Sequence, residues 1–166
     1  MSQAPTIKPA DGKLGILLPG LGSVATTVIA GVEGTKKGIA RPIGSLTQMS
    51  TIRLGKRTEG RSPLIKDFID LAELDQIVFG AWDPIPDDAY DSALNSGVLE
   101  RHHLDPIEAE LRAVKPMPAA FDTAYVKRLE GPNVKSGANK RELAEQLRQD
   151  IRDFKEANNC DRVVMV

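Results

Sequence analysis

The sequence predicts an α/β fold built around a mostly parallel sheet, and three observations support this. An apolar run at residues 14–18 breaks into Gly-Leu-Gly and is followed by a helix-like segment of small and β-branched residues. Consecutive apolar residues at 77–79, and again at 163–166, are typical of strands buried on both faces, as in parallel sheets. Helical segments stand between these strands, and parallel neighbours need such crossovers.

Glycine, proline and hydropathy set the limits of the expected elements. Residues 1–12 are expected to form an N-terminal tail, because prolines and a glycine stand there among polar residues. One domain would span residues 13–166, with an insertion at about 35–74 that is rich in Gly, Ser, Thr and Arg and has no sustained periodicity. The expected elements are strands at 13–18 and 75–83, helices at 23–35, 87–96 and 106–114, a mixed segment at 119–138, a helix at 139–159 and a strand at 161–166.

The most regular periodicity belongs to the helix at 139–159. Its apolar residues recur at helical spacing and its opposite face is charged, so we expect it to pack on the sheet. The apolar stripe consists of Leu143, Leu147, Ile151 and Phe154. The buried strand expected after it runs to Val166, and open α/β sheets place their ligands beyond the carboxyl ends of their strands. We therefore expect these residues to be the front part of a longer polypeptide.

Composition excludes several classes of function. Lys plus Arg number 22 against 23 Asp plus Glu, and a formal net charge of -1 gives no field that would gather nucleic acid or an anionic membrane. No stretch reaches the roughly 18 apolar residues of a membrane helix, so a soluble, cytoplasmic protein is expected. Cys160 is the only cysteine, and with His102 and His103 it gives no metal-site spacing. We expect no metal, and we interpret Cys160 as a packing residue.

The glycine turn after the first strand has the pattern G-x-G-x-x-A and opens a helix. The first glycine permits the sharp turn, the second lets the backbone approach a pyrophosphate, and the helix N-terminus attracts the anion. This context predicts a Rossmann-like site for a dinucleotide. A strand-to-helix turn that needs glycine for geometry alone is the alternative. The candidate pyrophosphate loop consists of Gly20, Leu21, Gly22, Ser23, Val24 and Ala25.

A dinucleotide site of this kind also needs an acid at the end of the second strand, to accept hydrogen bonds from the adenosine ribose. The usual spacing is about 20 residues, but no strand ends in an acid there. The next convincing strand ends at Asp83, so the site requires residues 35–74 to be an insertion. A carboxylate at this place favours NAD over its 2′-phosphorylated form. The alternative is that Asp83 only initiates the turn at Pro84.

Six blocks of the sequence, in order, resemble the N-terminal part of bacterial members of the myo-inositol-1-phosphate synthase (inositol-3-phosphate synthase) family. These blocks are LLPGLGSVATTVIAGVE, GSLTQMSTIRLGKRTEGRSPLIKDF, IVFGAWD, KPMPAAFD, GPNVKSG and LAEQLRQDIRDFKEANNCDRVVMV. The resemblance implies a Rossmann-like NAD-binding domain, incomplete in this chain because the catalytic and oligomerisation domain is missing. It also implies an isomerase of myo-inositol and phospholipid biosynthesis.

The family converts D-glucose 6-phosphate to 1D-myo-inositol 3-phosphate with a tightly held NAD. By this resemblance, sugar carbon 5 is oxidised, an intramolecular aldol reaction joins carbon 6 to carbon 1, and the hydride is then returned. The resemblance further implies a homo-oligomer, a tetramer, in which the remaining part of the same enzyme supplies the catalytic lysines from beyond Val166.

Residue by residue, the glycine turn matches the family's pyrophosphate loop and Asp83 matches its ribose-binding acid. Many members carry asparagines and a further glycine where this chain has Ser23-Val24-Ala25. Backbone contacts are therefore transferred to this loop, and side-chain contacts are not. Nothing is transferred to residues 121–128, which correspond only loosely to a nucleotide-contacting stretch.

Two other functions are consistent with parts of the sequence. The chain could be a non-catalytic NAD-binding or assembly module, or an ordinary NAD-dependent dehydrogenase. The dehydrogenase lacks support because His102 and His103 stand in a polar stretch expected to connect helices.

A basic cluster in the insertion could bind a sugar phosphate, since guanidinium groups suit phosphate oxygens, or could be a solvated or subunit-contacting loop. This cluster consists of Arg53, Lys56, Arg57 and Arg61.

Overall fold

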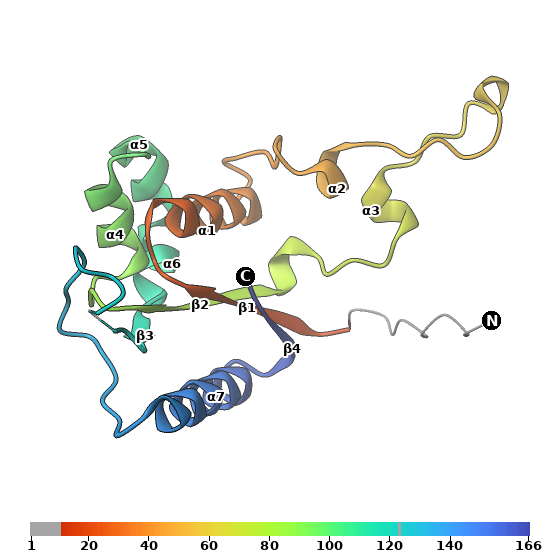
Figure 1. Cartoon of the computed structure of the whole chain (residues 1–166). Helices are drawn as coiled ribbons and strands as arrows, with labels where there is room; N and C mark the ends of the chain where they lie inside the picture. Colours follow the sequence, from red (N-terminus) through yellow and green to blue (C-terminus); the bar gives the residue numbers. More distant parts are fainter. Residues whose placement is uncertain (1–10, 123) are drawn as a thin grey trace, which may run out of the picture.

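A computed structural model describes residues 11–122 and 124–166 and contains a four-stranded sheet in the order β3-β2-β1-β4. All neighbouring strands in it are parallel (Figure 1). The prediction of an α/β fold with a parallel sheet is confirmed. The expected N-terminal tail, except for residues 11 and 12, lies outside the described residues. The strands are β1 (Lys13–Pro19), β2 (Ile77–Asp83), β3 (Pro116–Pro118) and β4 (Cys160–Met165).

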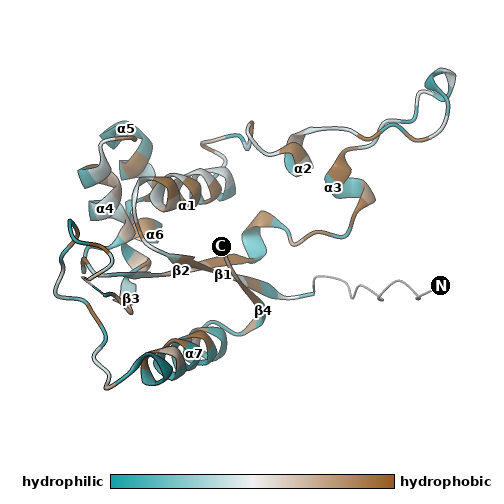
Figure 2. Cartoon of the chain, in the orientation of Figure 1, coloured by the Kyte–Doolittle hydropathy of each residue, from teal (hydrophilic) through white to brown (hydrophobic). Residues whose placement is uncertain are grey.

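Helices cover both faces of the sheet (Figure 1). One face packs against α1 (Ser23–Lys36), α4 (Ala89–Ser96) and α6 (Glu108–Ala113), which share a core with the apolar side chains of β1 and β2. The opposite face packs against α7 (Lys140–Ala157). The strands are hydrophobic along much of their length, whereas α7 carries many hydrophilic positions (Figure 2). The chain continues from β1 to β2 on one side, and β4 later pairs with β1 on the other side. The carboxyl end of β1 is therefore a topological switch point, where open parallel sheets bind ligands.

The aromatic ring of Phe154 fixes α7 on the sheet. A Cβ built on Gly15 of β1 would lie 2.7 Å from Cε1 of Phe154, and one built on Gly80 of β2 would lie 2.6 Å from Cε2. The ring therefore occupies the space that two side chains would fill on neighbouring strands. Leu147 and Ile151, further along the predicted stripe, pack in the same cluster beneath the carboxyl ends of the strands.

The predicted helices α1, α4 and α7 are confirmed within two residues at their ends. Asp88 and Asn139 cap α4 and α7 by accepting backbone N–H bonds, and Gly97 ends α4 with φ 64°. The expected helix at 106–114 begins as a 3-10 turn, η3 (Asp105–Ile107), and continues as α6.

Two elements differ from the sequence prediction. The polar stretch around His102 and His103, expected as a connection, forms the short helix α5 (Arg101–Leu104), because Leu104 is fully buried. The proline-rich stretch that ends the preceding helix contains β3, which pairs with β2 alone among the described strands. An edge strand tolerates prolines because one of its sides makes no ladder bonds.

The prediction that the last strand is buried is wrong. β4 forms and pairs in parallel with β1, but Cys160 is its only buried residue. Val164 and Met165 are 44% and 63% exposed. Within the described residues, no strand pairs with the second edge of β4. Its apolar composition therefore does not translate into burial here.

Residues 37–76, between α1 and β2, form an arm that projects from the sheet (Figure 1). Its two limbs are tied by an antiparallel bridge between Thr51 and Leu64. Apolar side chains on the arm are exposed, among them Ile43 at 76% and Leu46 at 69%. Across the described part of the chain, no helix has both the length and the apolar character to cross a membrane. The arm's helical turns are α2 (Leu46–Met49), η1 (Arg57–Glu59), α3 (Ile65–Phe68) and η2 (Leu74–Gln76).

Candidate functional site

The glycine turn lies at the carboxyl end of β1, between the two central strands. The N–H of Gly20 donates to the carbonyl of Trp82 in β2 at 2.8 Å, and also to Leu18 at 3.0 Å. Gly20 has φ 119°, a conformation that other residues rarely adopt, so the backbone requires glycine at this position. The turn therefore directs the chain from β1 into α1 at a fixed angle.

Gly22 differs from Gly20, because neither its backbone nor its packing requires glycine. Its φ of -82° is open to any residue, and a Cβ built on it would meet no protein atom within 4 Å. It is the N-cap of α1, and the first N–H groups of a helix have no acceptor within the helix. An open space in front of these N–H groups fits a pyrophosphate approaching the backbone.

The remaining residues of the predicted loop point in different directions. Leu21 is buried in the core, and its N–H already donates to Asp83. Ser23 and Val24 are exposed, and Ala25 packs at the edge of the core. With these side chains, the loop can offer a ligand the backbone N–H groups of the helix N-terminus.

Asp83 lies beside the glycine turn, although the two are far apart in the sequence. Its Oδ2 accepts the N–H of Leu21 at 2.7 Å, and its Oδ1 accepts the N–H of Ile85 at 2.9 Å. The second bond is the turn-initiating contact that the alternative interpretation requires. The first joins the carboxylate to the loop, as parallel neighbouring strands would place it. Each carboxylate oxygen keeps a further lone pair for a hydroxyl donor.

A cavity of about 380 Å³ opens between the glycine turn and α7, at the carboxyl edge of the sheet. Asp83 and Arg148 are the charged residues that line it, and most of the other residues are apolar. An apolar cavity with few polar groups is typical of small-molecule sites. The lining consists of Pro19, Gly20, Trp82, Asp83, Pro84, Ala119, Ala120, Phe121, Leu129, Leu147, Arg148, Ile151 and Met165.

Ala119, Phe121 and Leu129 form one wall of this cavity, although the sequence predicted no site residue between 119 and 138. These residues follow β3, and ligands in parallel sheets lie just beyond the carboxyl ends of strands. Recognising a strand at Pro116–Pro118 would have directed attention to them. The two prolines argue locally against a strand, because proline has no N–H to donate to a neighbouring strand.

Environment shifts the pKa of Tyr90, Glu110, Arg112 and Cys160, none of which lines the cavity. Hydrogen bonding to Asp105 raises the pKa of Tyr90, and hydrogen bonding to Lys37 lowers that of Glu110. The guanidinium of Arg112 bonds Glu108 and Asp91, which raises its pKa. These residues join α1, α4 and the α5–α6 segment on the far face of the sheet. Burial raises the pKa of the Cys160 thiol, in agreement with a packing role.

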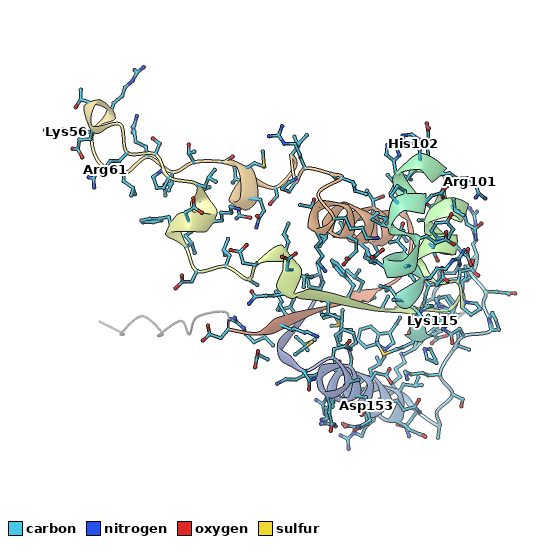
Figure 3. The ribbon with its side chains drawn as sticks, turned by 180° about the vertical axis from the view of Figure 1, so that it is seen from behind. Lys56, Arg61, Arg101, His102, Lys115 and Asp153 are labelled. Carbon is cyan, nitrogen blue, oxygen red and sulfur yellow. The ribbon has the colours of Figure 1, made fainter. Side chains whose placement is uncertain are left out.

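The two other clusters considered from the sequence lie elsewhere. Lys56 and Arg61 stand at the far end of the arm (Figure 3), where Arg61 pairs with Glu59 at 2.8 Å. His102 is on α5, across the sheet from α7 (Figure 3), and its ring centroid is 3.8 Å from that of His103. The structure brings neither cluster to the cavity. Among the described residues, no group of three or more His, Cys, Asp or Glu side chains could hold a metal ion.

Comparison with known proteins assigns the whole sheet to one family. Residues 14–166 match the model of the NAD-binding domain described as myo-inositol-1-phosphate synthase. The chain is 52% identical over 161 residues to inositol-3-phosphate synthase 1 of Bacteroides thetaiotaomicron, which covers 96% of the chain and 37% of that relative. It is 32% identical over 170 residues to inositol-3-phosphate synthase 1 of Oryza sativa subsp. japonica, covering 93% of the chain and 33% of that relative.

A solved structure shares the fold. The crystal structure of inositol-3-phosphate synthase from Caenorhabditis elegans superposes with a TM-score of 0.83 at 23% identity, over 95% of this chain and 34% of that one. The chain thus spans about a third of the length of the relatives that it matches. The family resemblance inferred from the six sequence blocks is confirmed.

Proposed function

The chain belongs to the myo-inositol-1-phosphate synthase family, and from this premise we propose that it is the nucleotide-binding part of an enzyme that converts D-glucose 6-phosphate to 1D-myo-inositol 3-phosphate. NAD is the cofactor of the domain that the chain matches. The observation that carries the proposal is the open space at Gly22, in front of the N-terminus of α1. No contact within the protein excludes a side chain there, and a glycine at this helix N-terminus leaves room for a pyrophosphate to approach the backbone.

The residues of this chain bind and orient the cofactor, which supplies a hydride acceptor and donor when it is bound. The N–H groups at the start of α1 hold the pyrophosphate, assisted by the helix dipole. Asp83 accepts hydrogen bonds from the adenosine ribose while Leu21 holds its Oδ2 in place. A 2′-phosphate would bring a second negative charge against this carboxylate, so the site favours NAD over NADP.

The cavity beside Asp83 takes the adenosine half of the cofactor. Its apolar wall from Phe121, Leu129 and Ile151 suits a flat heterocycle and excludes water from it. Arg148 also lines the cavity, and its guanidinium forms an ion pair with Oε1 of Glu145 at 2.7 Å. This guanidinium can stack on the adenine ring.

The rival function is a non-catalytic NAD-binding or assembly module. Such a module would bind NAD without turnover. The charged residues that line the cavity, Asp83 and Arg148, do not include a paired general acid and base, so this chain alone does not distinguish the two functions. We propose that the groups that take the carbon 6 proton and stabilise the enolate oxygen belong to the remaining part of the same enzyme. By family resemblance the enzyme is a cytoplasmic homotetramer that contributes to phospholipid biosynthesis.

The test compares residues 1–166 with the full-length protein in an assay for inositol phosphate, using glucose 6-phosphate and NAD. Turnover by the full-length protein and none by residues 1–166 is the expected result, since each lost electrostatic donor costs about 3–4 kcal/mol of transition-state stabilisation. NAD binding by the full-length protein without turnover would favour the module. Turnover by residues 1–166 at a comparable rate would show that the catalytic groups lie within these residues. The molar mass of the full-length protein from sedimentation equilibrium tests the proposed tetramer, which requires four times the mass of one chain.

A further inference from the structure

The GPNVKSG block places Asn133 against the carboxyl ends of two strands. The backbone N–H of Asn133 donates to the carbonyl of Pro84 at 2.9 Å. Its side-chain Nδ2 donates to the carbonyl of Asp83 at 2.8 Å and to that of Pro116 at 3.3 Å. One carboxamide therefore joins the end of β2 to the start of β3. The two N–H groups of a carboxamide can serve two carbonyls, which a carboxylate or an aliphatic side chain of the same size cannot do.

The backbone around Asn133 fits closely against the turn that follows β2. A Cβ built on Gly131 would overlap the carbonyl of Pro84, so only glycine allows this approach. Asn133 and Lys135 bond the backbone of Ala119 on either side, at 3.0 Å and 2.8 Å. The segment 131–135 is thus docked by its main chain, with the Asn133 side chain directed at Asp83.

The same segment is held to α7 by a second anchor. The Nζ atom of Lys135 lies 2.8 Å from Oδ2 of Asp150, and the Lys135 side chain is only 8% exposed. Oδ2 of Asp150 also accepts the indole N–H of Trp82 at 2.7 Å. Trp82 and Asp83 are neighbours at the end of β2 and both line the cavity. Residues 131–135 therefore constrain Asp83 directly through Asn133, and Trp82 through Lys135 and Asp150.

We propose that Asn133 is a positioning residue for NAD, which acts by fixing the backbone of Asp83 so that its carboxylate meets the glycine turn and the ribose. This inference rests on the proposed function, because it takes Asp83 as the group that NAD contacts. Asn133 lies outside the residues that line the cavity and touches no ligand itself. Without its two bonds, the turn at Pro84 can shift and the carboxylate moves with it.

A double-mutant cycle in the full-length protein tests the proposal, with NAD affinity measured by calorimetry. Asn133→Ala should raise the dissociation constant about tenfold, and Asp83→Asn should raise it by at least as much. If Asn133 acts through Asp83, adding Asn133→Ala to Asp83→Asn should cost less than about twofold more. Equal losses in both backgrounds would overturn the proposal, as would an unchanged dissociation constant in the folded Asn133→Ala protein.

Two further variants separate positioning from general stability. Asn133→Leu keeps nearly the size and shape of the side chain but has no donor, so NAD affinity should fall about as far as in the Ala variant; a Leu variant with wild-type affinity would refute a role for the donated bonds. The Leu variant also replaces Ala in the cycle if the Ala protein is insoluble. Asn158→Ala is the matched control, because Asn158 also donates its amide to a backbone carbonyl, that of Phe154 at 2.9 Å, away from the cavity. It should leave NAD affinity unchanged. No effect of Asp83→Asn alone would instead reject the proposed ribose contact.

Discussion

Replacing Gly22 with Val tests the nucleotide site most directly, because the structure separates its effects on folding and binding. The position has φ -82°, and a Cβ placed there would have no protein atom within 4 Å apart from its chain neighbours, so the backbone conformation and the Cβ of Val are both accommodated. Gly22 is, however, the N-cap of α1, where Val is a poor residue. We therefore expect the free energy of unfolding to fall by no more than about 1 kcal/mol.

The effect of Gly22→Val on binding should be larger than its effect on stability. Two methyl groups would occupy the space in front of the helix N-terminus and hold the pyrophosphate away from the N–H groups. A hydrogen bond to a charged group contributes about 1.5–3 kcal/mol. Losing one such bond would raise the dissociation constant for NAD roughly 10- to 150-fold.

The assay is calorimetric titration of NAD into the folded full-length protein, with a denaturation curve for each variant. Gly31→Val is the matched control, because Gly31 lies in the same helix and its Cβ would also meet nothing within 4 Å. It should leave NAD affinity unchanged and not lower stability, since Val is a better helix residue than glycine. Unchanged affinity in Gly22→Val would mean that the pyrophosphate does not lie against this helix N-terminus.

Three other residues allow equally direct measurements. Asp83→Asn should weaken NAD about tenfold or more and NADP by less, because it removes a charge from beside the ribose; equal losses would limit Asp83 to holding the turn. Gly80→Ala should lower the free energy of unfolding by about 1–3 kcal/mol, since its Cβ would lie 2.6 Å from the ring of Phe154; an unchanged denaturation midpoint would contradict this packing. Cys160 should react slowly with iodoacetamide at mildly alkaline pH until the protein unfolds, because burial raises the pKa of its thiol and leaves less thiolate; equal rates in both states would show an accessible thiol.

The parts of the fold that the sequence predicted correctly depend on strong local patterns. The helix α7 follows from apolar residues at helical spacing, and the strand–turn–helix unit at β1 follows from glycines set directly after an apolar run. The position of Asp83 was predictable despite the long insertion, because strands joined by one crossover pair as parallel neighbours. The insertion changes the spacing in sequence and leaves the spacing in the sheet unaltered.

Features that depend on distant contacts were not predictable. The strand at Pro116–Pro118 exists because β2 offers it an edge, and its prolines argue against a strand locally. The exposure of Val164 and Met165 depends on which elements lie beside β4, which hydropathy does not report. The place of Ala119 in the cavity wall has no local signal, because its backbone is held by bonds to Asn133 and Lys135.

The glycines around the site show why a sequence motif alone does not identify a ligand. Gly20 is required by its positive φ, and Gly131 by the carbonyl of Pro84 that lies where its Cβ would be. Both would be needed in a protein that binds nothing. Gly22 has an ordinary φ and open space around it, so neither the backbone nor the packing excludes a side chain at this position. Gly31 is equally unconstrained, but of the two only Gly22 is the N-cap of α1, next to N–H groups that have no acceptor within the helix. An unconstrained glycine at a helix N-terminus, rather than the motif as a whole, therefore supports the dinucleotide site.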